Sequence, residues 1–294
     1  MKRREFLISA GVFAFAGFAA RAADKKMSDR PSAALGNEPV KVYFTGTGGA
    51  DWAGKAKTGG ETRANAGVFL QNSVLIDLTP SSAKNLPAGA APKAVFYTHS
   101  HPDHYFPKEL GKYKTIERVY AHEGWAGKVE KDIRAVFKSK SRPEVIPVKV
   151  GDVYEEQGMA FMPLKANHYT GLKDEQCLIY SVRTKKSHLL YATDTSGLMA
   201  ETVAMIKVPL TGLVMNAMVG VGRFAKGRLF SHSTPEQVVK TVEALKAIGK
   251  YKAPGNRPVW TTHLSYTMNG TQDETEKEYP AGVVPAYDKL EVTI

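Results

Sequence analysis

The sequence predicts an α/β fold in which sheets are covered by helices. Short runs rich in β-branched and aromatic residues, typical of strands, recur in both halves of the 294-residue chain. Two longer segments, residues 123–139 and 234–249, instead have apolar residues at helical spacing. Because strands with interspersed helices follow a similar order in both halves, we expect sheets packed against helices in one domain that covers residues 39–294.

The first half begins with short strands joined by a hairpin. Asn72 and Ser73 are expected to form the tight turn between the second strand and the third. The continuous apolar run "KAVFYTH" predicts a buried strand that ends at a histidine. Predicted strands in this half cover residues 40–46, 67–72, 73–78 and 93–99.

The second half contains further strands around a well-defined helix at 234–249. Thr234 can be its N-cap, Pro235 suits its first position, and Gln237 completes a capping box. Gly249 is expected to end this helix. Predicted strands in this half cover residues 158–168, 177–184, 187–194, 212–218, 257–263 and 289–294.

Three of the eight histidines gather in "YTHSHPDHYF", residues 97–106. In an extended segment His99 and His101 point to the same side, and a turn can bring Asp103 and His104 to the same pocket. Nitrogen and carboxylate ligands suit zinc, manganese or iron. Because one catalytic zinc ion uses three protein ligands, four candidates in six residues favour two metal ions.

Three later polar residues each close an apolar run. His168 ends "FMPLKANH", Asp194 ends "LLYATD" and His263 ends "PVWTTH". Taken singly, His168 fits an ordinary surface histidine and Asp194 fits the start of a turn. Together with the histidine cluster, they predict the remaining ligands of a two-metal centre at the ends of strands.

The run "THSHPDH" resembles the H-x-H-x-D-H signature of the metallo-β-lactamase fold superfamily, and the resemblance extends over residues 41–294. It implies an αββα sandwich of two mixed sheets, with a dinuclear site at one edge. Asp77, in "VLIDLTP", matches a family position that supports the site rather than binds metal. His168, Asp194 and His263 follow in the family's order.

The resemblance also implies how the ligands are divided between two divalent metal ions. Zinc is expected, with manganese or iron as alternatives. Asp103 and Asp194 would orient a hydroxide held between the ions. One ion would be held by His99, His101 and His168, the other by Asp103, His104 and His263, with Asp194 bridging them.

His232, in "FSHSTPEQ" just before the helix at 234–249, narrows the subfamily. With "FTGTGGADW" (44–52) and "AYDKLEV" (286–292), it resembles the phosphodiesterase branch, which includes phosphonate-pathway cyclic phosphodiesterases and transfer-RNA 3′-processing ribonucleases. The flexible arm of the RNA enzymes is not evident here. The single cysteine, Cys177, cannot build the cysteine zinc site of the phosphonate enzymes.

The resulting prediction is an exported, dinuclear metal-dependent hydrolase that cleaves phosphodiester bonds by a metal-bridged hydroxide. His232 would stabilise charge on the phosphoryl oxygens or protonate the leaving group; the plainer alternative is a histidine that only hydrogen-bonds locally. Two other functions stay open. One is a hydrolase of β-lactams, lactones or thioesters on the same site, which would not need His232. The other is a periplasmic metal-binding protein without catalysis.

The first 22 residues are typical of an export signal. Arg3 and Arg4 precede an apolar stretch, residues 6–20, and a small-residue cleavage site ends at Ala22. The core "RREFL" resembles a twin-arginine signal. We expect residues 1–22 to be removed, residues 23–38 to form a linker, and the mature protein, without a membrane span, to be periplasmic or secreted.

The net charge of the chain indicates which kinds of partner it can bind. Residues 1–22 hold four basic residues and one acidic residue, so their removal lowers the formal net charge from +11 to +8. This basic surface can favour a small anionic substrate, or can simply be solvated. No stable nucleic-acid partner is expected, since an exported protein would not meet cytoplasmic transfer RNA, and a homodimer stays open. The glycine-rich segment 48–67 can cover the site, with Asp51 and Trp52 shaping it.

Overall fold

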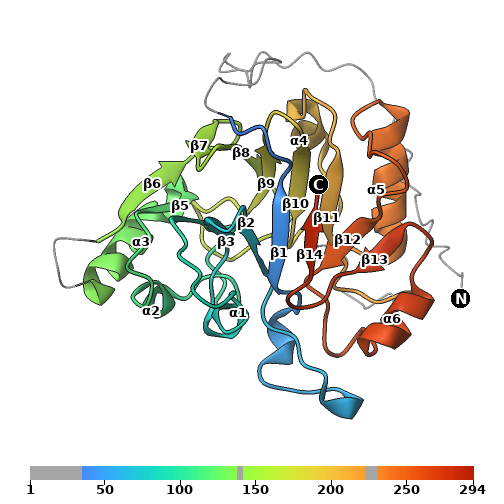
Figure 1. Ribbon diagram of the computed structural model, residues 1–294, viewed down its shortest axis with the longest axis horizontal. Helices are drawn as coiled ribbons and strands as arrows, with labels where there is room; N and C mark the ends of the chain where they lie inside the picture. The colour runs from blue at the N-terminus through green and yellow to red at the C-terminus, as the bar shows by residue number, and fades with distance from the viewer. Residues whose placement is uncertain (1–34, 138–141, 223–230) are drawn as a thin grey trace, which may run out of the picture.

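The structure is a computed structural model that describes residues 35–137, 142–222 and 231–294. Within these residues the strands form two seven-stranded sheets (Figure 1). The predicted export signal and most of the predicted linker lie outside the described residues. In order across the first sheet, the strands are β14 (Glu291–Thr293), β1 (Lys41–Gly46), β2 (Gly67–Leu70), β3 (Val74–Ile76), β4 (Ala94–Phe96), β5 (Arg118–His122) and β6 (Glu144–Val148).

The second sheet has the same plan. In both sheets, antiparallel hairpins on one side continue into four parallel strands, β3 to β6 and β10 to β13. The carboxyl ends of parallel strands meet at one edge of a sheet. In order across the second sheet, the strands are β13 (Val283–Pro285), β12 (Val259–Thr262), β11 (Gly212–Asn216), β10 (His188–Ala192), β9 (Leu178–Arg183), β8 (Met159–Lys165) and β7 (Tyr154–Glu156).

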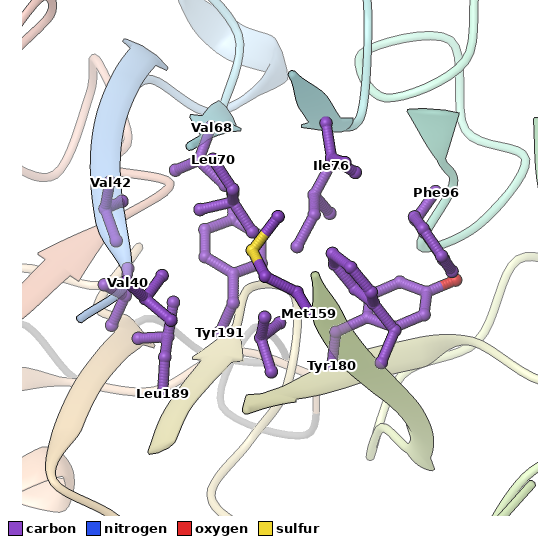
Figure 2. Packing of buried hydrophobic residues seen from close by; sticks show 14 of the residues in the cluster. Val40, Val42, Val68, Leu70, Ile76, Phe96, Met159, Tyr180, Leu189 and Tyr191 are labelled. Carbon is purple, nitrogen blue, oxygen red and sulfur yellow. The ribbon is translucent and has the colours of Figure 1, made fainter. Parts of the chain in front are cut away.

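The two sheets pack face to face over an apolar core. Figure 2 shows Val42 and Ile76 of the first sheet opposite Met159, Leu189 and Tyr191 of the second, all fully buried. Alternate residues of each strand point into this layer, as the period of two in a pleated strand requires. Burial of these side chains holds the two sheets together.

Helices cover the outer faces. On the first sheet, Val129 and Ile133 of α3 pack in a cluster with strand residues such as Val119. On the second sheet, Val238 of α5 packs in a cluster with Leu213. The αββα sandwich implied by the family resemblance is therefore confirmed (Figure 1). The helices are α1 (Pro80–Ala83), α2 (Pro107–Leu110), α3 (Glu123–Val136), α4 (Ala200–Met205), α5 (Pro235–Ala247) and α6 (Gln272–Glu278).

The structure confirms the predicted capping box and departs from the sequence prediction mainly at short elements. The capping box of α5 is present, with Thr234 accepting from the Gln237 backbone N–H. The hairpin turn is centred on Gln71 and Asn72, whose φ angles are 48° and 52°, one residue earlier than predicted. Strands β5, β6, β7 and β13 and helices α1, α2, α4 and α6 were not predicted, because each is short and has little periodicity.

No helix in the described part of the chain is long and apolar enough to cross a membrane.

Candidate metal centre

The candidate ligands meet at one edge of the sandwich, where strands from both sheets end. His99 and His101 follow β4, and Asp103 and His104 lie on the same loop. His168 follows β8. Asp194 follows β10, and His263 follows β12 directly. Since β8, β10 and β12 run in the same direction, their carboxyl ends deliver these three residues to the same edge.

His99, His101 and His168 form one group of ligand atoms. His99 Nε2 lies 3.0 Å from His101 Nδ1, and His101 Nδ1 lies 3.4 Å from His168 Nε2. One ligand atom from each residue lies within 4.8 Å of the others, as binding of a shared ion requires.

Asp103, His104 and His263 form a second group. Asp103 Oδ2 lies 3.4 Å from His104 Nε2 and 3.3 Å from His263 Nε2. His104 is completely buried and His263 is 3% exposed, so these ring nitrogens meet away from bulk water.

Asp194 lies between the two groups. Its Oδ2 is 3.5 Å from His99 Nε2 and 2.5 Å from His104 Nε2. Its Oδ1 is 3.1 Å from His263 Nδ1. One carboxylate therefore contacts members of both groups, the arrangement expected of a bridging ligand.

The geometry fits metal ions. A tetrahedral zinc ion with Zn–N distances of about 2.0–2.1 Å has its ligand atoms roughly 3.3–3.4 Å apart. The observed distances of 3.0 and 3.4 Å in the first group, and of 3.4 and 3.3 Å in the second, are close to that value. In addition, the buried atoms His104 Nε2, Asp194 Oδ1 and His263 Nδ1 have no well-aligned hydrogen bond among the described residues, although His104 Nε2 lies 2.5 Å from Asp194 Oδ2 and Asp194 Oδ1 lies 3.1 Å from His263 Nδ1. Such atoms are normally satisfied, and a bound cation would satisfy them.

The pKa shifts of four candidate ligands also suit metal binding. Burial lowers the pKa of His99 well below its usual value and that of His168 to about 4, so both imidazoles have a free lone pair at neutral pH. Burial would raise the pKa of Asp103 and Asp194, but the surrounding histidines more than compensate, and both pKa values are lowered. Both carboxylates are therefore ionised and can act as ligands.

Asp77 supports the candidate ligands through hydrogen bonds and belongs to neither ligand group. Its carboxylate accepts from the Thr98 backbone N–H and the Thr98 hydroxyl, both at 2.8 Å, and contacts His104 Nδ1 at 2.7 Å. A carboxylate on the second ring nitrogen fixes the orientation and tautomer of a ligating histidine. These contacts agree with the supporting position expected for Asp77.

The backbone is unusual at three of these positions. Asp77, Asp194 and His263 have φ angles of 61°, 42° and 61°, in the left-handed region that non-glycine residues rarely adopt. Each lies within two residues of the end of a strand. Strained backbone of this kind costs about 1–3 kcal/mol and is concentrated at functional sites.

His232 adjoins the second group and Asp194 but belongs to neither group of three ligands. Its Nδ1 is 3.3 Å from Asp194 Oδ1, and its ring is stacked over that of His263 with centroids 5.4 Å apart. It also forms a potential ligand group with His168 and Asp194. The structure thus brings every predicted site residue to one place.

Asn216 is a site residue that the sequence analysis missed. It ends β11, is completely buried, and has its Nδ2 3.3 Å from His232 Nδ1. Its Oδ1 accepts from the backbone N–H groups of Met218 and Ser233. A lone amide inside the apolar run "GLVMNAM" was the available signal, since a buried amide needs polar partners.

The segment 48–67 supports the loop that follows His263. Asp51 accepts hydrogen bonds from Ser265 Oγ and the Tyr266 backbone N–H, and buried Trp52 donates to the Leu264 carbonyl. A Cβ on Gly49 would lie 3.3 Å from His263 Cε1, so the absence of a side chain lets this segment pack against the His263 ring. Asp51 and Trp52 therefore brace one side of the site.

Comparison with solved structures identifies the fold. The structure resembles a diphosphatase from the PhnP family (23% identity, TM-score 0.61, 87% of this chain and 97% of that one). It also resembles zinc-bound PqqB from Methylobacterium extorquens (12%, 0.64, 86% and 100%) and the short form of human tRNase Z (17%, 0.62, 86% and 99%). No curated protein matches the sequence.

The fold and the edge site define the class of metallo-β-lactamase-fold proteins, whose members bind divalent metals. The family model described as the Beta-lactamase superfamily domain matches residues 72–253, more than half of the chain. The protein belongs to this superfamily.

Proposed function

We propose that this protein is an exported, dinuclear metal-dependent hydrolase that cleaves phosphodiester bonds. The observation that carries the proposal is the meeting of two three-ligand groups at Asp194, with His232 beside them. A site for a single ion would use only one of these groups. A protein that binds metal without catalysis would not need a buried, oriented histidine outside both groups.

Two bound ions would supply Lewis acidity to the phosphoryl oxygens and make a water nucleophile available near neutral pH. His99, His101 and His168 would hold one ion, and Asp103, His104 and His263 the other. Asp194, in contact with both groups, would bridge them. Zinc suits this nitrogen-rich set, with manganese or iron as alternatives.

His232 Nδ1 lies 3.3 Å from both Asp194 Oδ1 and Asn216 Nδ2. With the Asp194 carboxylate engaged by the ions, the Asn216 amide would decide the tautomer and His232 would carry its proton on Nε2. The Asn216 amide is oriented by the two backbone N–H groups that bond its Oδ1, so its Nδ2 donates towards His232 Nδ1. A nitrogen that accepts a hydrogen bond cannot carry the ring proton of a neutral imidazole. His232 can then donate its Nε2 proton to a leaving oxygen, a contribution of ~10²–10⁴-fold in rate.

The names of three structural neighbours support hydrolysis at phosphorus over hydrolysis at a carbonyl carbon. One neighbour is named as a diphosphatase, another as a tRNase and a third as yeast PDE1. The sequence motif around His232 points to the same branch. These relations concern the reaction type, and they leave the substrate itself to experiment.

A substrate panel tests the proposal. Metal-loaded protein is assayed with bis-aryl phosphodiesters, cyclic nucleotides, lactones, β-lactams and thioesters. The proposal expects turnover of phosphodiesters and little turnover of the carbonyl substrates. Turnover of a lactone, thioester or β-lactam with no phosphodiester activity would assign the site to the carbonyl hydrolases instead.

Export is supported by the amino-terminal sequence alone. Arg3 and Arg4 precede the apolar stretch and the small-residue cleavage site. Replacing both by lysine keeps the charge but removes the twin-arginine pair. The replacement is expected to trap the protein inside the cell, as fractionation would detect. Unchanged export of the double variant would argue for an ordinary secretory route.

A further inference from the structure

Glu175 lies outside every candidate ligand group and yet joins the two loops that carry the first group. Its Oε1 accepts from the Ser100 backbone N–H at 2.7 Å. Its Oε2 accepts from the Ser100 hydroxyl at 2.6 Å and from the Thr170 hydroxyl at 2.7 Å. Hydrogen bonds to an ionised carboxylate are among the stronger ones in proteins.

The partners of Glu175 are placed where they control ligand positions. Ser100 is the residue between His99 and His101, and Thr170 is two residues after His168. One carboxylate therefore ties together the three residues that would hold the first ion.

Glu175 itself is held in place by packing against α3. The backbone N–H of Gln176 donates to His122 Nδ1, which also accepts from the backbone N–H of Gly124 at the start of α3. A Cβ on Gly124 would lie 1.6 Å from the Asp174 carbonyl oxygen, so only glycine allows this close approach. The segment that carries Glu175 is thus docked on a regular helix.

The second group has a different support. Asp77 contacts His104 and the Thr98 backbone, and its carboxylate is completely buried. Among the described residues, Glu175 has no hydrogen bond to Asp103, His104 or His263, whereas its bonds flank all three residues of the first group. Removal of the Glu175 carboxylate should therefore affect the two metal positions unequally.

We propose that Glu175 is a positioning residue that sets the metal affinity of the His99–His101–His168 position. This inference rests on the dinuclear site of the proposed function. Outer partners of this kind contribute about 10–100-fold to metal affinity. Without the carboxylate, the two loops lose their shared anchor, and the three imidazoles must be ordered when the ion binds.

The test compares three variants of the full-length mature protein. Glu175→Ala removes all three bonds. Glu175→Gln keeps one acceptor for the Ser100 N–H and can donate to the two hydroxyls, so it should preserve the connection. Asp174→Asn removes the neighbouring exposed carboxylate and serves as the matched control. Each protein is stripped of metal, checked by circular dichroism, and titrated with zinc and with cobalt in competition with a chelator.

The wild-type protein, Asp174→Asn and Glu175→Gln are expected to bind two ions per chain with similar affinities. Glu175→Ala should bind one ion as before and the other ~10–100-fold more weakly. The cobalt absorption spectrum should lose the component of one site only. Affinities for both ions that are unchanged from wild type in Glu175→Ala, or an equal loss at both positions, would overturn the inference. A wild-type protein that binds no second ion would instead contradict the proposed function, and the inference would fall with it.

Discussion

At the scale of single residues, the proposed proton donor is His232. Its Nδ1 lies 3.3 Å from both Asp194 Oδ1 and Asn216 Nδ2, and its ring is stacked over that of His263. The ring therefore presents its other nitrogen, Nε2, away from these contacts. Neither three-ligand group includes His232. Its contribution should appear in the chemical step and not in the metal content.

Replacement of His232 by alanine should lower kcat ~10²–10⁴-fold for phosphodiesters with poor leaving groups. The effect should shrink for p-nitrophenolate esters, because a good leaving group needs no protonation. Steady-state kinetics over a series of aryl leaving groups, with metal content measured in parallel, checks this expectation. An equal loss for all leaving groups would point to charge stabilisation, and a loss of bound metal would make His232 a ligand.

Asn216→Asp should reverse the hydrogen bond to His232. Aspartate can still accept from the Met218 and Ser233 N–H groups, but its other oxygen accepts where the amide donated. The proton of His232 should then move to Nδ1, and much of the rate that His232 supplies should be lost. Nitrogen-15 chemical shifts of the His232 ring report the tautomer directly. An Nε2–H tautomer in the variant with unchanged kcat would refute the assignment.

At the scale of elements, the ends of strands and the start of one helix build the site. Asp77, Asp194 and His263 adopt left-handed backbone within two residues of the ends of β3, β10 and β12. His232 lies two residues before Thr234, the N-cap of α5. The capping box fixes the direction in which the chain enters this helix. It therefore also fixes the segment that carries His232.

Thr234→Ala should destabilise the protein by about 0.5–2 kcal/mol, the usual cost of losing an N-cap. It should also lower kcat, because the His232 segment loses its anchor. Thr271→Ala is the matched control, since Thr271 caps α6 in the same way without adjoining a predicted ligand. Denaturant unfolding and kinetics of both variants check the expectation. Equal effects of the two variants on kcat would show that the α5 cap has no special relation to the site.

At the scale of the whole molecule, the site joins the two sheets. His99, His101, Asp103 and His104 come from the first sheet, while His168, Asp194 and His263 come from the second. Bound ions would therefore connect the two sheets, in addition to the apolar core between them. Ligands that bind only the folded state stabilise it according to their concentration relative to Kd.

Removal of metal should lower the melting temperature without unfolding the protein at room temperature. An ion present at ~100 times its Kd stabilises by about 2.7 kcal/mol. For domains of ~150–250 residues, 1 kcal/mol shifts Tm by about 2–4 °C. We therefore expect a fall of at least ~5 °C after chelation, measured by calorimetry and reversed by zinc. An unchanged Tm would mean that the ions do not link the sheets.

Much of this architecture follows from the sequence because its signals are local. The helices α3 and α5 are long and periodic, and each candidate ligand closes an apolar run or lies in the histidine motif. Edge strand β6 contains Pro147 and is partly exposed, so its pattern is weak. Asn216 and Glu175 gain their significance from partners 16 and 75 residues away, at His232 and Ser100. Contacts of that range depend on the folded topology.

The most direct test of the account is the rate of phosphodiester hydrolysis as a function of metal ions bound per chain. Metal-free protein is titrated with zinc or manganese, and hydrolysis of a bis-aryl phosphodiester is followed after each addition. Catalysis by two ions predicts negligible activity without metal and a maximum at two ions per chain. Full activity without metal, full activity with one ion, or no hydrolysis at two ions per chain would contradict it.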